Sequence, residues 1–503
     1  MKTKLLNILL LAGVLFSATS CVDLTQEPQS FISEEDYYKI EGATQKSIPG
    51  LYYTLWHGNY GFNCRIMRLN TQADDITVSP SKPANLLNNM QRLSPALMAN
   101  AKDFEMLWEN FMNVINETNR LICYSEIPED EKKAKNLKEA LGEAHFMRAL
   151  AYFYTVRIFG DAPLLVDPRE NAAEMPRVSV EKIYEEVIVP SLKQAIEWLP
   201  EVSRTHNSSS PSTYAAKTCL ADVYLTMAGW PLKKEGYYAK AAEMAKEVID
   251  ANKYSLQASY ADLWKEENKA SSSEFIFALH HSVANKIASQ YGKSFYPIDF
   301  HPNAGWADYY GNLDFYKAYP DDDRKAWNYM TEWESKVAVV GGKEGETEVR
   351  RIGFEESKDR LPAIAKYYDY NNGKPGKSQL SNGVTSIYRY ADVLLIYAEA
   401  SNLATHQVSD FALACLNEVQ ERANSPKTTT KDSAEFDEAV LAERGWEFLA
   451  EGRRWFDLVR REKVAEKRSE VWEGSLYQKQ GHYYYAIPQD QMDLTQWDNN
   501  KGY

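Results

Sequence analysis

Acidic and basic residues near the C-terminal end are spaced so that their side chains could act together, either in acid–base catalysis or in ion pairs. They recur at intervals of three and four residues and comprise Glu443, Arg444, Glu447, Glu451, Arg454, Asp457 and Arg460. On one helix, this spacing places opposite charges side by side, where they can form ion pairs. Glu447 and Glu451 could act as an acid and a base, but the neighbouring arginines would keep both carboxylates ionised. The pattern therefore favours a buried or half-buried clamp between helices, to which we expect three further residues to belong: Arg389, Asp392 and Glu399.

Other catalytic and ligand-binding patterns are missing from the sequence. It has no H-E-x-x-H, G-x-S-x-G or P-loop motif, and no two cysteines have C-x-x-C spacing. Glycoside hydrolysis needs two placed carboxylates, and nothing marks such a pair among the 71 acidic residues. We therefore expect a protein that is not an enzyme and has no resident metal or cofactor.

Helical periodicity dominates two blocks, which would carry these charges. The sequence predicts helices over residues 104–122, 136–159, 180–199, 211–228 and 238–251, and again over 386–403, 410–423 and 435–464. Small residues at the contact positions of paired helices resemble tetratricopeptide units. Residues 254–385 show no helical period, and within them the sequence predicts one short strand, over 274–279. The predicted fold is mainly α: a tetratricopeptide-like helical scaffold with long irregular loop and short-strand insertions.

The first 21 residues predict export and a lipid anchor. Lys2 and Lys4 precede an apolar run that is too short to span a bilayer, and small residues follow it up to Cys21. This arrangement resembles a bacterial lipoprotein signal. We expect residues 1–20 to be a signal peptide, and residues 21–31 to be the lipidated cysteine and a tether. An ordinary signal peptide with an unmodified Cys21 is the alternative.

The charge and hydropathy of the remaining chain exclude two classes of partner. The net charge is −14 and there is no basic run, so nucleic acid is not expected as a partner. No second long apolar segment follows the first, so the sequence predicts no transmembrane helix.

Several segments together resemble the SusD/RagB family of outer-membrane nutrient-binding lipoproteins. In chain order they are GEAHFMRALAYFYTVRIFGDAPLL (142–165), YYAKAAEMAKEVIDANKYSL (237–256), RYADVLLIYAEA (389–400), ERGWEFLAEGRRWFDLVR (443–460) and YAIPQ (485–489). The chain departs from the family at its end, where WDNNKGY (497–503) replaces the usual Q-N-P-G-Y. The resemblance divides the chain into an N-terminal SusD-like helical region (32–255), a loop-rich insertion that is the candidate ligand face (256–385), and a C-terminal RagB/SusD helical region with a tail (386–503).

The resemblance also implies a function. Such a protein is lipid-anchored and surface-exposed at the cell outer membrane, where it binds a complex nutrient, with a glycan or oligosaccharide as the favoured ligand. It delivers this ligand to a SusC-type TonB-dependent transporter and breaks no bond. Two other functions stay open: a surface glycan hydrolase on a helical scaffold, or a peptide-binding or adaptor protein of the same assembly.

Two segments have the composition of a sugar site, where aromatic faces stack on rings and polar groups bind hydroxyls. In residues 301–312, Trp306, Tyr309 and Tyr310 would stack, and Asn303 and Asp308 would form hydrogen bonds. The alternative for Tyr309 is a place in the core. The second segment supplies Trp56, Tyr60, Asp74 and Asp75. The resemblance implies an acidic residue at the ligand face near the last two positions.

Overall fold

The computed structural model describes residues 32–56, 62–81, 102–289, 291–302, 304–367, 382–467 and 481–503. The predicted signal peptide, Cys21 and the tether to residue 31 lie outside these ranges. Among the helices of the described part, none combines the length and apolar content that a membrane span needs.

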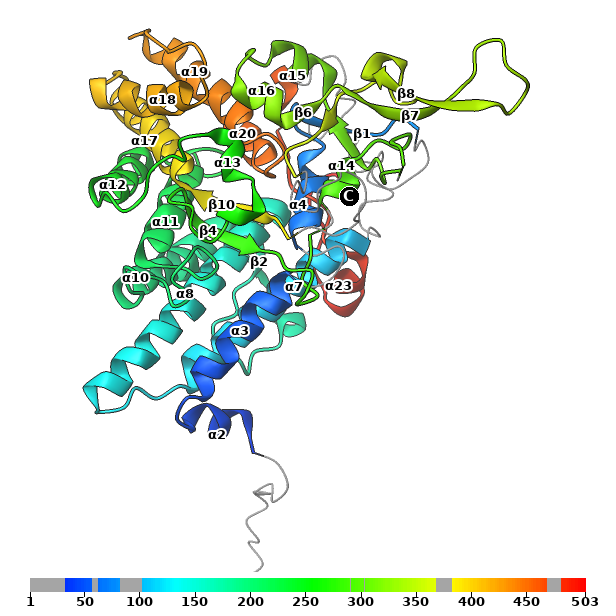
Figure 1. Ribbon diagram of the computed structural model, residues 1–503. Coiled ribbons are helices and arrows are strands. Elements are labelled where there is room, and N and C mark those ends of the chain that lie inside the picture. The colour runs from blue at the N-terminus through cyan, green and yellow to red at the C-terminus, as the bar shows by residue number, and fades with distance from the viewer. Residues whose placement is uncertain are drawn as a thin grey trace, which may run out of the picture.

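A stack of helices forms the main body, with successive members packed against one another (Figure 1). In chain order they are α7 (Lys102–Tyr124), α8 (Glu131–Phe159), α10 (Val189–Trp198), α11 (Thr213–Ala228), α12 (Gly236–Asp250), α17 (Tyr390–Thr405), α18 (Asp410–Arg422) and α19 (Ser433–Glu447). The mainly α, tetratricopeptide-like scaffold is therefore confirmed.

The stack is continuous although its two halves are far apart in sequence. Helix α12 packs on both α11 and α17. Ala241 and Ala245 of α12 are fully buried, and their small side chains let the neighbouring helices approach closely. Residues 251–389 therefore leave the stack after α12 and return to it at α17.

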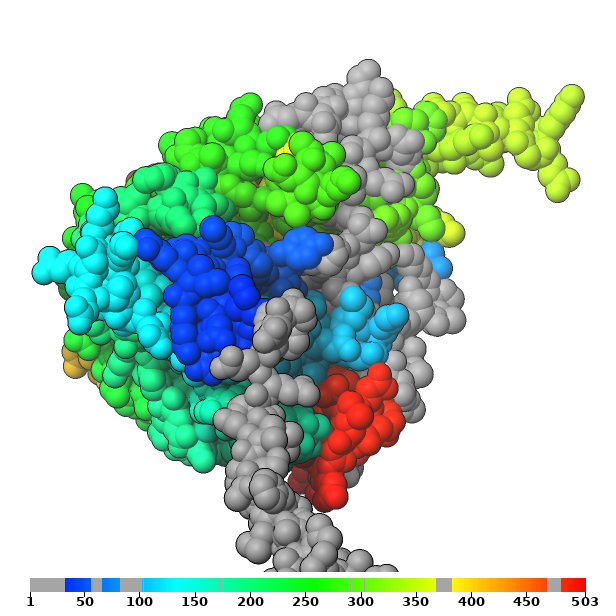
Figure 2. Space-filling view, turned by 90° about the horizontal axis from the view of Figure 1, so that it is seen from below, coloured from blue at the N-terminus to red at the C-terminus, as the bar shows by residue number. Residues whose placement is uncertain are grey.

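Shorter helices surround the stack. The N-terminal ones are α2 (Glu34–Lys39), α3 (Ala43–Trp56) and α4 (Phe62–Asn70). Figure 2 shows the first two (blue) on one face of the molecule, beside the start of α8 (cyan). The remaining ones are α9 (Val180–Ile183), the π-helix η2 (Tyr184–Ile188), α13 (Tyr260–Leu263), α14 (Tyr291–Phe295), α15 (Leu313–Ala318), α16 (Asp323–Asn328), α20 (Arg454–Arg460), α21 (Val464–Lys467), α23 (Gln489–Leu494) and the 3-10 turns η1 (Ala172–Glu174), η3 (Glu266–Asn268) and η4 (Phe354–Glu356).

The strands of the described part form antiparallel pairs. These are β1 (Ile76–Val78) with β5 (Tyr309–Gly311), β2 (Ala162–Pro163) with β3 (Arg177–Val178), β4 (Phe275–His280) with β10 (Val384–Arg389), β6 (Tyr329–Met330) with β9 (Ala363–Ile364), and β7 (Glu332–Ala338) with β8 (Thr347–Gly353). The β4–β10 pair closes the base of the excursion, and the β7–β8 hairpin projects from the body (Figure 1).

The predicted helix over 180–199 is divided into α9, η2 and α10, that over 136–159 begins earlier, at Glu131, and two others differ more. Residues 386–389 belong to strand β10, so the helix predicted over 386–403 begins at Tyr390. The helix predicted over 435–464 is interrupted between α19 and α20, where Ala450 and Gly452 have positive φ angles of 57° and 76°. A β-carbon at position 452 would also lie 2.7 Å from Ile66 Cγ2, so this turn requires glycine.

The predicted clamp exists, and its centre is Arg389. This side chain is fully buried, and its guanidinium donates to Glu274 Oε1 (2.8 Å), to Glu451 Oε1 (2.8 Å) and to Glu447. Arg389 therefore joins the residue just before β4 to α19 and to the turn after it. A guanidinium without water needs such partners, because an unpaired buried charge is very costly.

The partners of the two glutamates differ from those expected. Glu447 is paired with Arg324, Arg389 and Arg422, and Glu451 with Lys366 and Arg389. The two arginines expected to hold them bind elsewhere: Arg444 Nε donates to Asp457 Oδ2 (2.8 Å) and Arg454 Nε to Asp74 Oδ1 (2.6 Å). The interruption after α19 removes the helical register that the expectation required.

The network keeps Glu447 and Glu451 ionised. Burial raises the pKa of Glu447, but the charges of Arg422, Arg389 and Arg324 outweigh this and hold the pKa well below its usual value. Glu451 has a lowered pKa in the same way, through Arg389 and Lys366. Paired carboxylates with lowered pKa values hold the fold together and are unsuited to proton transfer.

Removing the central guanidinium should destabilise the whole fold. We expect Arg389→Met to lower the free energy of unfolding by about 3–5 kcal/mol, because it leaves buried carboxylates unpaired. The matched control is Arg351→Met, whose guanidinium pairs with Glu332 (2.8 Å) but is 73% exposed, and which should change stability little. Denaturant unfolding measures both, and equal effects would contradict a central role for Arg389.

Candidate functional site

The first candidate segment is tightly held by its backbone. Gly305 N donates to Pro297 O (2.8 Å), Ala307 N to Tyr296 O (3.0 Å) and Asp308 N to Ser294 O (2.8 Å). Residues 304–308, here called the Trp306 loop, therefore lie against α14 and the residues that follow it. A loop fixed in this way can hold a side chain in place for a ligand at little entropic cost.

The backbone of this loop passes so close to Tyr296 that position 305 has to be glycine. A β-carbon at Gly305 would lie 1.9 Å from Tyr296 O, far inside contact distance, so only glycine fits here. Trp306 follows directly, and its backbone N–H donates to Lys293 O (3.0 Å). The turn thereby presents Trp306 and Asp308, both of which are half-buried.

Two of the predicted stacking residues are in the core. Tyr309 and Tyr310 are 2% and 1% exposed, and they belong to strand β5. The Tyr309 ring packs on Phe295, with ring centroids 5.4 Å apart. Rings enclosed in this way cannot stack on a sugar, so the prediction for both residues is wrong, and the core alternative for Tyr309 is correct.

The second segment is brought beside the first by strand pairing. β1 pairs with β5 so that Ile76 lies opposite Gly311, and Asn312 N donates to Asp75 O (3.0 Å). Tyr60 and Asn303 lie outside the described residues, and for Trp56 only the backbone, at the end of α3, is described. The pairing thus places Asp75, more than 200 residues away in sequence, beside the end of the first segment.

The two aspartates of this segment have structural partners. Asp74 accepts two hydrogen bonds from Arg454 (2.6 and 2.9 Å). Asp75 is fully buried; its carboxylate accepts from Asn70 Nδ2 (2.9 and 3.0 Å) and from Ala450 N (3.2 Å). Asp75 is therefore out of reach of a ligand and fastens the turn after α19 to the candidate face, which corrects its predicted role. The Asp74 carboxylate is committed to Arg454.

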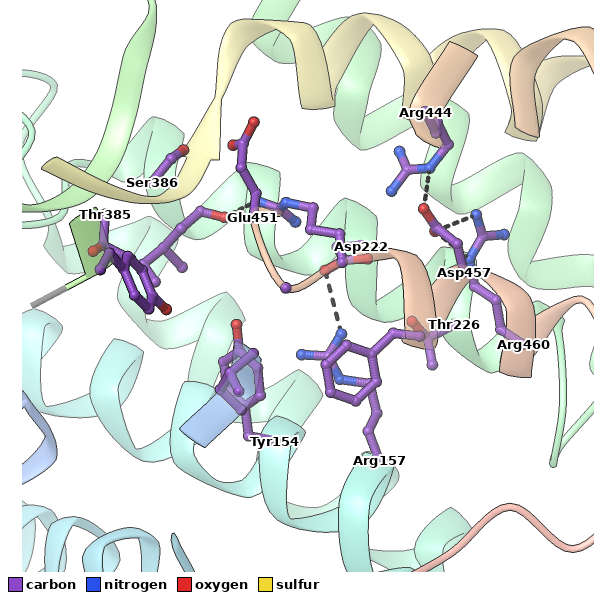
Figure 3. A pocket seen from close by; sticks show the side chains of 16 residues that line it. Tyr154, Arg157, Asp222, Thr226, Thr385, Ser386, Arg444, Glu451, Asp457 and Arg460 are labelled. Carbon is purple, nitrogen blue, oxygen red and sulfur yellow. Dashed lines mark hydrogen bonds and ion pairs between the residues drawn. The ribbon is translucent and has the colours of Figure 1, made fainter. Parts of the chain in front are cut away.

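Figure 3 shows a cavity of about 30 Å³ inside the charge network. Arg157 and Asp222 approach within 3.9 Å across it, and Asp457 accepts from both Arg444 (2.8 Å) and Arg460 (2.8 and 3.1 Å). The volume is that of about one water molecule. The cavity is therefore part of the interior packing and is too small for a sugar.

A groove of about 790 Å³ lies at the N-terminal helices, here called the α2–α8 groove. Its lining comes from the segment that spans α2 and the start of α3, from the first half of α8 and from residues 200–211. Ile40 and Val202, 48% and 63% exposed, belong to this lining. Its size is that of a ligand-binding site.

The polar side chains of the α2–α8 groove are held in place by hydrogen bonds and ion pairs within the protein. Glu143, with a side chain 3% exposed, accepts from Arg204 Nε (2.7 Å) and from Tyr52 Oη (2.5 Å). Lys133 pairs with Glu41 (2.9 Å), which links α8 to the α2–α3 connection. Sequence reasoning missed this groove because its walls come from separate segments that share no motif.

Comparisons with known proteins agree with this architecture. A sequence model described as the SusD family matches residues 273–502, and one described as starch-binding associating with outer membrane matches residues 48–225. A SusD-like protein P2 from Formosa agariphila is 26% identical over 479 residues, 89% of each chain. A SusD-like protein from Bacteroides ovatus is 27% identical over 476 residues, which are 91% of this chain and 82% of the relative.

Solved structures share the fold over most of the chain. A SusD superfamily protein from Parabacteroides distasonis superposes with a TM-score of 0.76 at 25% identity, covering 92% of this chain and 99% of the other. A protein described as a laminarin-binding SusD-like protein superposes with a TM-score of 0.73 at 22% identity, covering 93% of this chain and all of the other.

The position of Asp75 predicts a pH-dependent stability. Burial, followed by the charge of Asp74, raises the pKa of Asp75 from 3.8 to about 6. A raised pKa means that the folded protein holds this proton more tightly than the unfolded chain does. The contribution of protonated Asp75 to the free energy of unfolding is therefore full below about pH 4 and is lost as the pH rises through 6.

Comparison with Asp75→Asn isolates this contribution. The stability of the wild type relative to the variant should fall by about 3 kcal/mol between pH 4 and pH 7, as a shift of about two pH units implies. Denaturant unfolding across this range measures the difference. Asp314→Asn, at an aspartate with a side chain 73% exposed, is the control and should show no such trend. A pH-independent difference for Asp75→Asn would contradict the prediction.

Proposed function

We propose, from the premise that this chain belongs to the SusD/RagB family, that it binds a glycan or oligosaccharide at the cell surface. It then delivers this ligand to a TonB-dependent transporter in the outer membrane. The relatives support the coarser part of the proposal: the matched family is described as associating with the outer membrane, and a structural neighbour is described as binding laminarin.

The observation that carries the proposal is the Trp306 loop. It presents a half-buried indole and a half-buried carboxylate on a backbone fixed by hydrogen bonds to α14 and the residues after it. An indole face gives a sugar ring an apolar surface, and Asp308 can accept hydrogen bonds from hydroxyl groups. We propose Trp306 and Asp308 as ligand contacts, with Asn303, Trp56 and Tyr60 as further members of the same face.

Binding without hydrolysis is the preferred form of this function. A glycosidase needs one carboxyl group that can hold a proton near neutral pH. The best-spaced pair in the sequence, Glu447 and Glu451, is locked by cations and has lowered pKa values. This supports a binding protein over the hydrolase alternative.

Attachment to the membrane follows from the proposed lipid on Cys21. Residues 22–31 would connect the lipid to α2, which in Figure 1 lies at one extremity of the body. A ten-residue segment spans at most about 35 Å, so the body would stay close to the membrane surface. Capture of a polymer beside its transporter requires this closeness.

Removal of the indole should weaken glycan binding. We expect Trp306→Ala to lower the affinity at least tenfold, because truncating an aromatic residue at a binding hot spot costs about 2 kcal/mol. Calorimetry against the glycan that the wild type binds measures the effect. Tyr53→Ala is the control, since Tyr53 is a 55% exposed aromatic residue on α3. Unchanged affinity in Trp306→Ala would remove Trp306 from the site, and release of reducing ends by the wild type would overturn the binding function.

The α2–α8 groove favours a second role, in assembly with the transporter. It is next to the part of the chain that leads back to the proposed anchor, so it faces the region where a membrane partner would be. Its lining combines exposed apolar side chains with the Arg204–Glu143 pair, a combination suited to a polypeptide segment. We propose that a segment of the transporter docks in this groove.

A charge placed in the apolar lining should weaken this assembly. We expect Val202→Glu to reduce copurification of the transporter severalfold while glycan affinity stays unchanged, because it desolvates a carboxylate against apolar surface. Val340→Glu, at a 95% exposed residue beyond β7, is the control. Equal copurification of both variants with the transporter would exclude the groove as the docking site.

A further inference from the structure

Lys293 is a buried cation directly beneath the Trp306 loop. It lies in α14, is 6% exposed, and its Nζ donates to the carbonyl oxygen of Ala304. Ala304 is an exposed residue of the loop, so the ammonium lies only one residue below the surface. The backbone carbonyl of Lys293 also accepts from Trp306 N (3.0 Å), which ties the two residues together.

This ammonium has no anionic partner among the described residues. No carboxylate oxygen of these residues lies within 4.0 Å of Lys293 Nζ. Burial lowers the pKa of Lys293, and no neighbouring charge offsets the shift. Lys366, the other buried lysine in this half of the molecule, shows the contrast, because it is paired with Glu451 at 2.6 Å.

An uncompensated buried cation is costly to the fold. A Lys ammonium has three N–H donors, and for Lys293 one of them has a protein acceptor. A methionine of similar shape would fill the same space without the desolvation cost. Residues that burden stability in this way are characteristic of functional sites, where a ligand supplies the missing partner.

A second nitrogen of the same segment is also without a partner. His301 Nδ1 is buried and makes no hydrogen bond. Its backbone is held in place, since His301 N donates to Glu334 O (2.7 Å). Among the described residues, Lys293 Nζ thus has one hydrogen-bond acceptor and His301 Nδ1 has no partner.

We propose that Lys293 recognises an anionic group on the ligand, so that the bound glycan carries carboxylate or sulfate groups. This inference rests on the proposed glycan-binding function and names its substrate class. The ammonium would pair with the anion beneath the loop while the Trp306 indole stacks on the sugar ring. In the poorly hydrated site this ion pair is stronger than one on the surface. The net charge of −14 disfavours polyanions in general, so their binding needs a local cation such as Lys293.

The test compares charged and neutral polysaccharides. Full-length wild type and Lys293→Met are titrated with polygalacturonate, which carries carboxylates, with dextran sulfate, which carries sulfates, and with neutral laminarin. We expect the wild type to bind one of the two anionic polymers, and Lys293→Met to bind it at least tenfold more weakly. Lys317→Met, at a lysine with a side chain 65% exposed on α15, is the control and should match the wild type.

Thermal unfolding without glycan separates recognition from a purely structural role. If Lys293 serves the ligand, Lys293→Met should unfold at the same temperature as the wild type or at a higher one. A lower melting temperature with unchanged affinity would show that Lys293 only anchors Ala304, and would overturn the inference. Wild type that binds laminarin and neither polyanion would also overturn it while leaving the proposed function intact. Wild type that binds none of the three would count against the proposed function itself.

Discussion

The fold depends on one electrostatic constraint: Arg389 has to be neutralised without water. Its guanidinium meets acidic side chains from the residue before β4, from α19 and from the turn after α19, so satisfying it fixes three segments at once. The Phe448 ring lies 4.5 Å from its central carbon and excludes solvent. Because that turn also contacts Asp75 and Lys366, the same constraint extends to the face that carries the Trp306 loop. Scaffold and candidate site are thus parts of one interaction network.

Local sequence patterns predict the helical stack well and its junctions poorly. The repeat of apolar and small residues in α8, α11 and α12 is a property of each segment alone, so periodicity reveals it. Strand β10 directly precedes α17, and its last four residues, Ser386 to Arg389, carry no turn or helix-breaking residue that would separate them from the helix. Only pairing with β4, more than 100 residues earlier, makes them extended. The turn after α19 likewise depends on distant partners, such as Asp75.

The candidate site shows the same division between local and distant information. Composition selects residues 301–312 as a candidate site, but it cannot tell which aromatic side chains face inward. Tyr309 and Tyr310 are buried because β5 pairs with β1, a partner more than 200 residues away. Lys293 stands in an aromatic stretch without any motif, so only the three-dimensional arrangement reveals that its charge is uncompensated. Residue types therefore indicate the kind of site, and burial decides its members.

The long sequence separations in the charge network also determine when this protein can fold. A ribosome makes Glu274 first, Arg389 115 residues later, and Glu447 a further 58 residues after that. Until Glu447 and Glu451 are made, Arg389 can pair with Glu274 but lacks its other two acidic partners. The emerging chain is thereby kept from closing its core early, and the finished chain should fold late and as a unit, at the slow rate typical of distant contacts. A core that closes only after Glu451 has been made leaves the earlier segments without their final packing during most of synthesis.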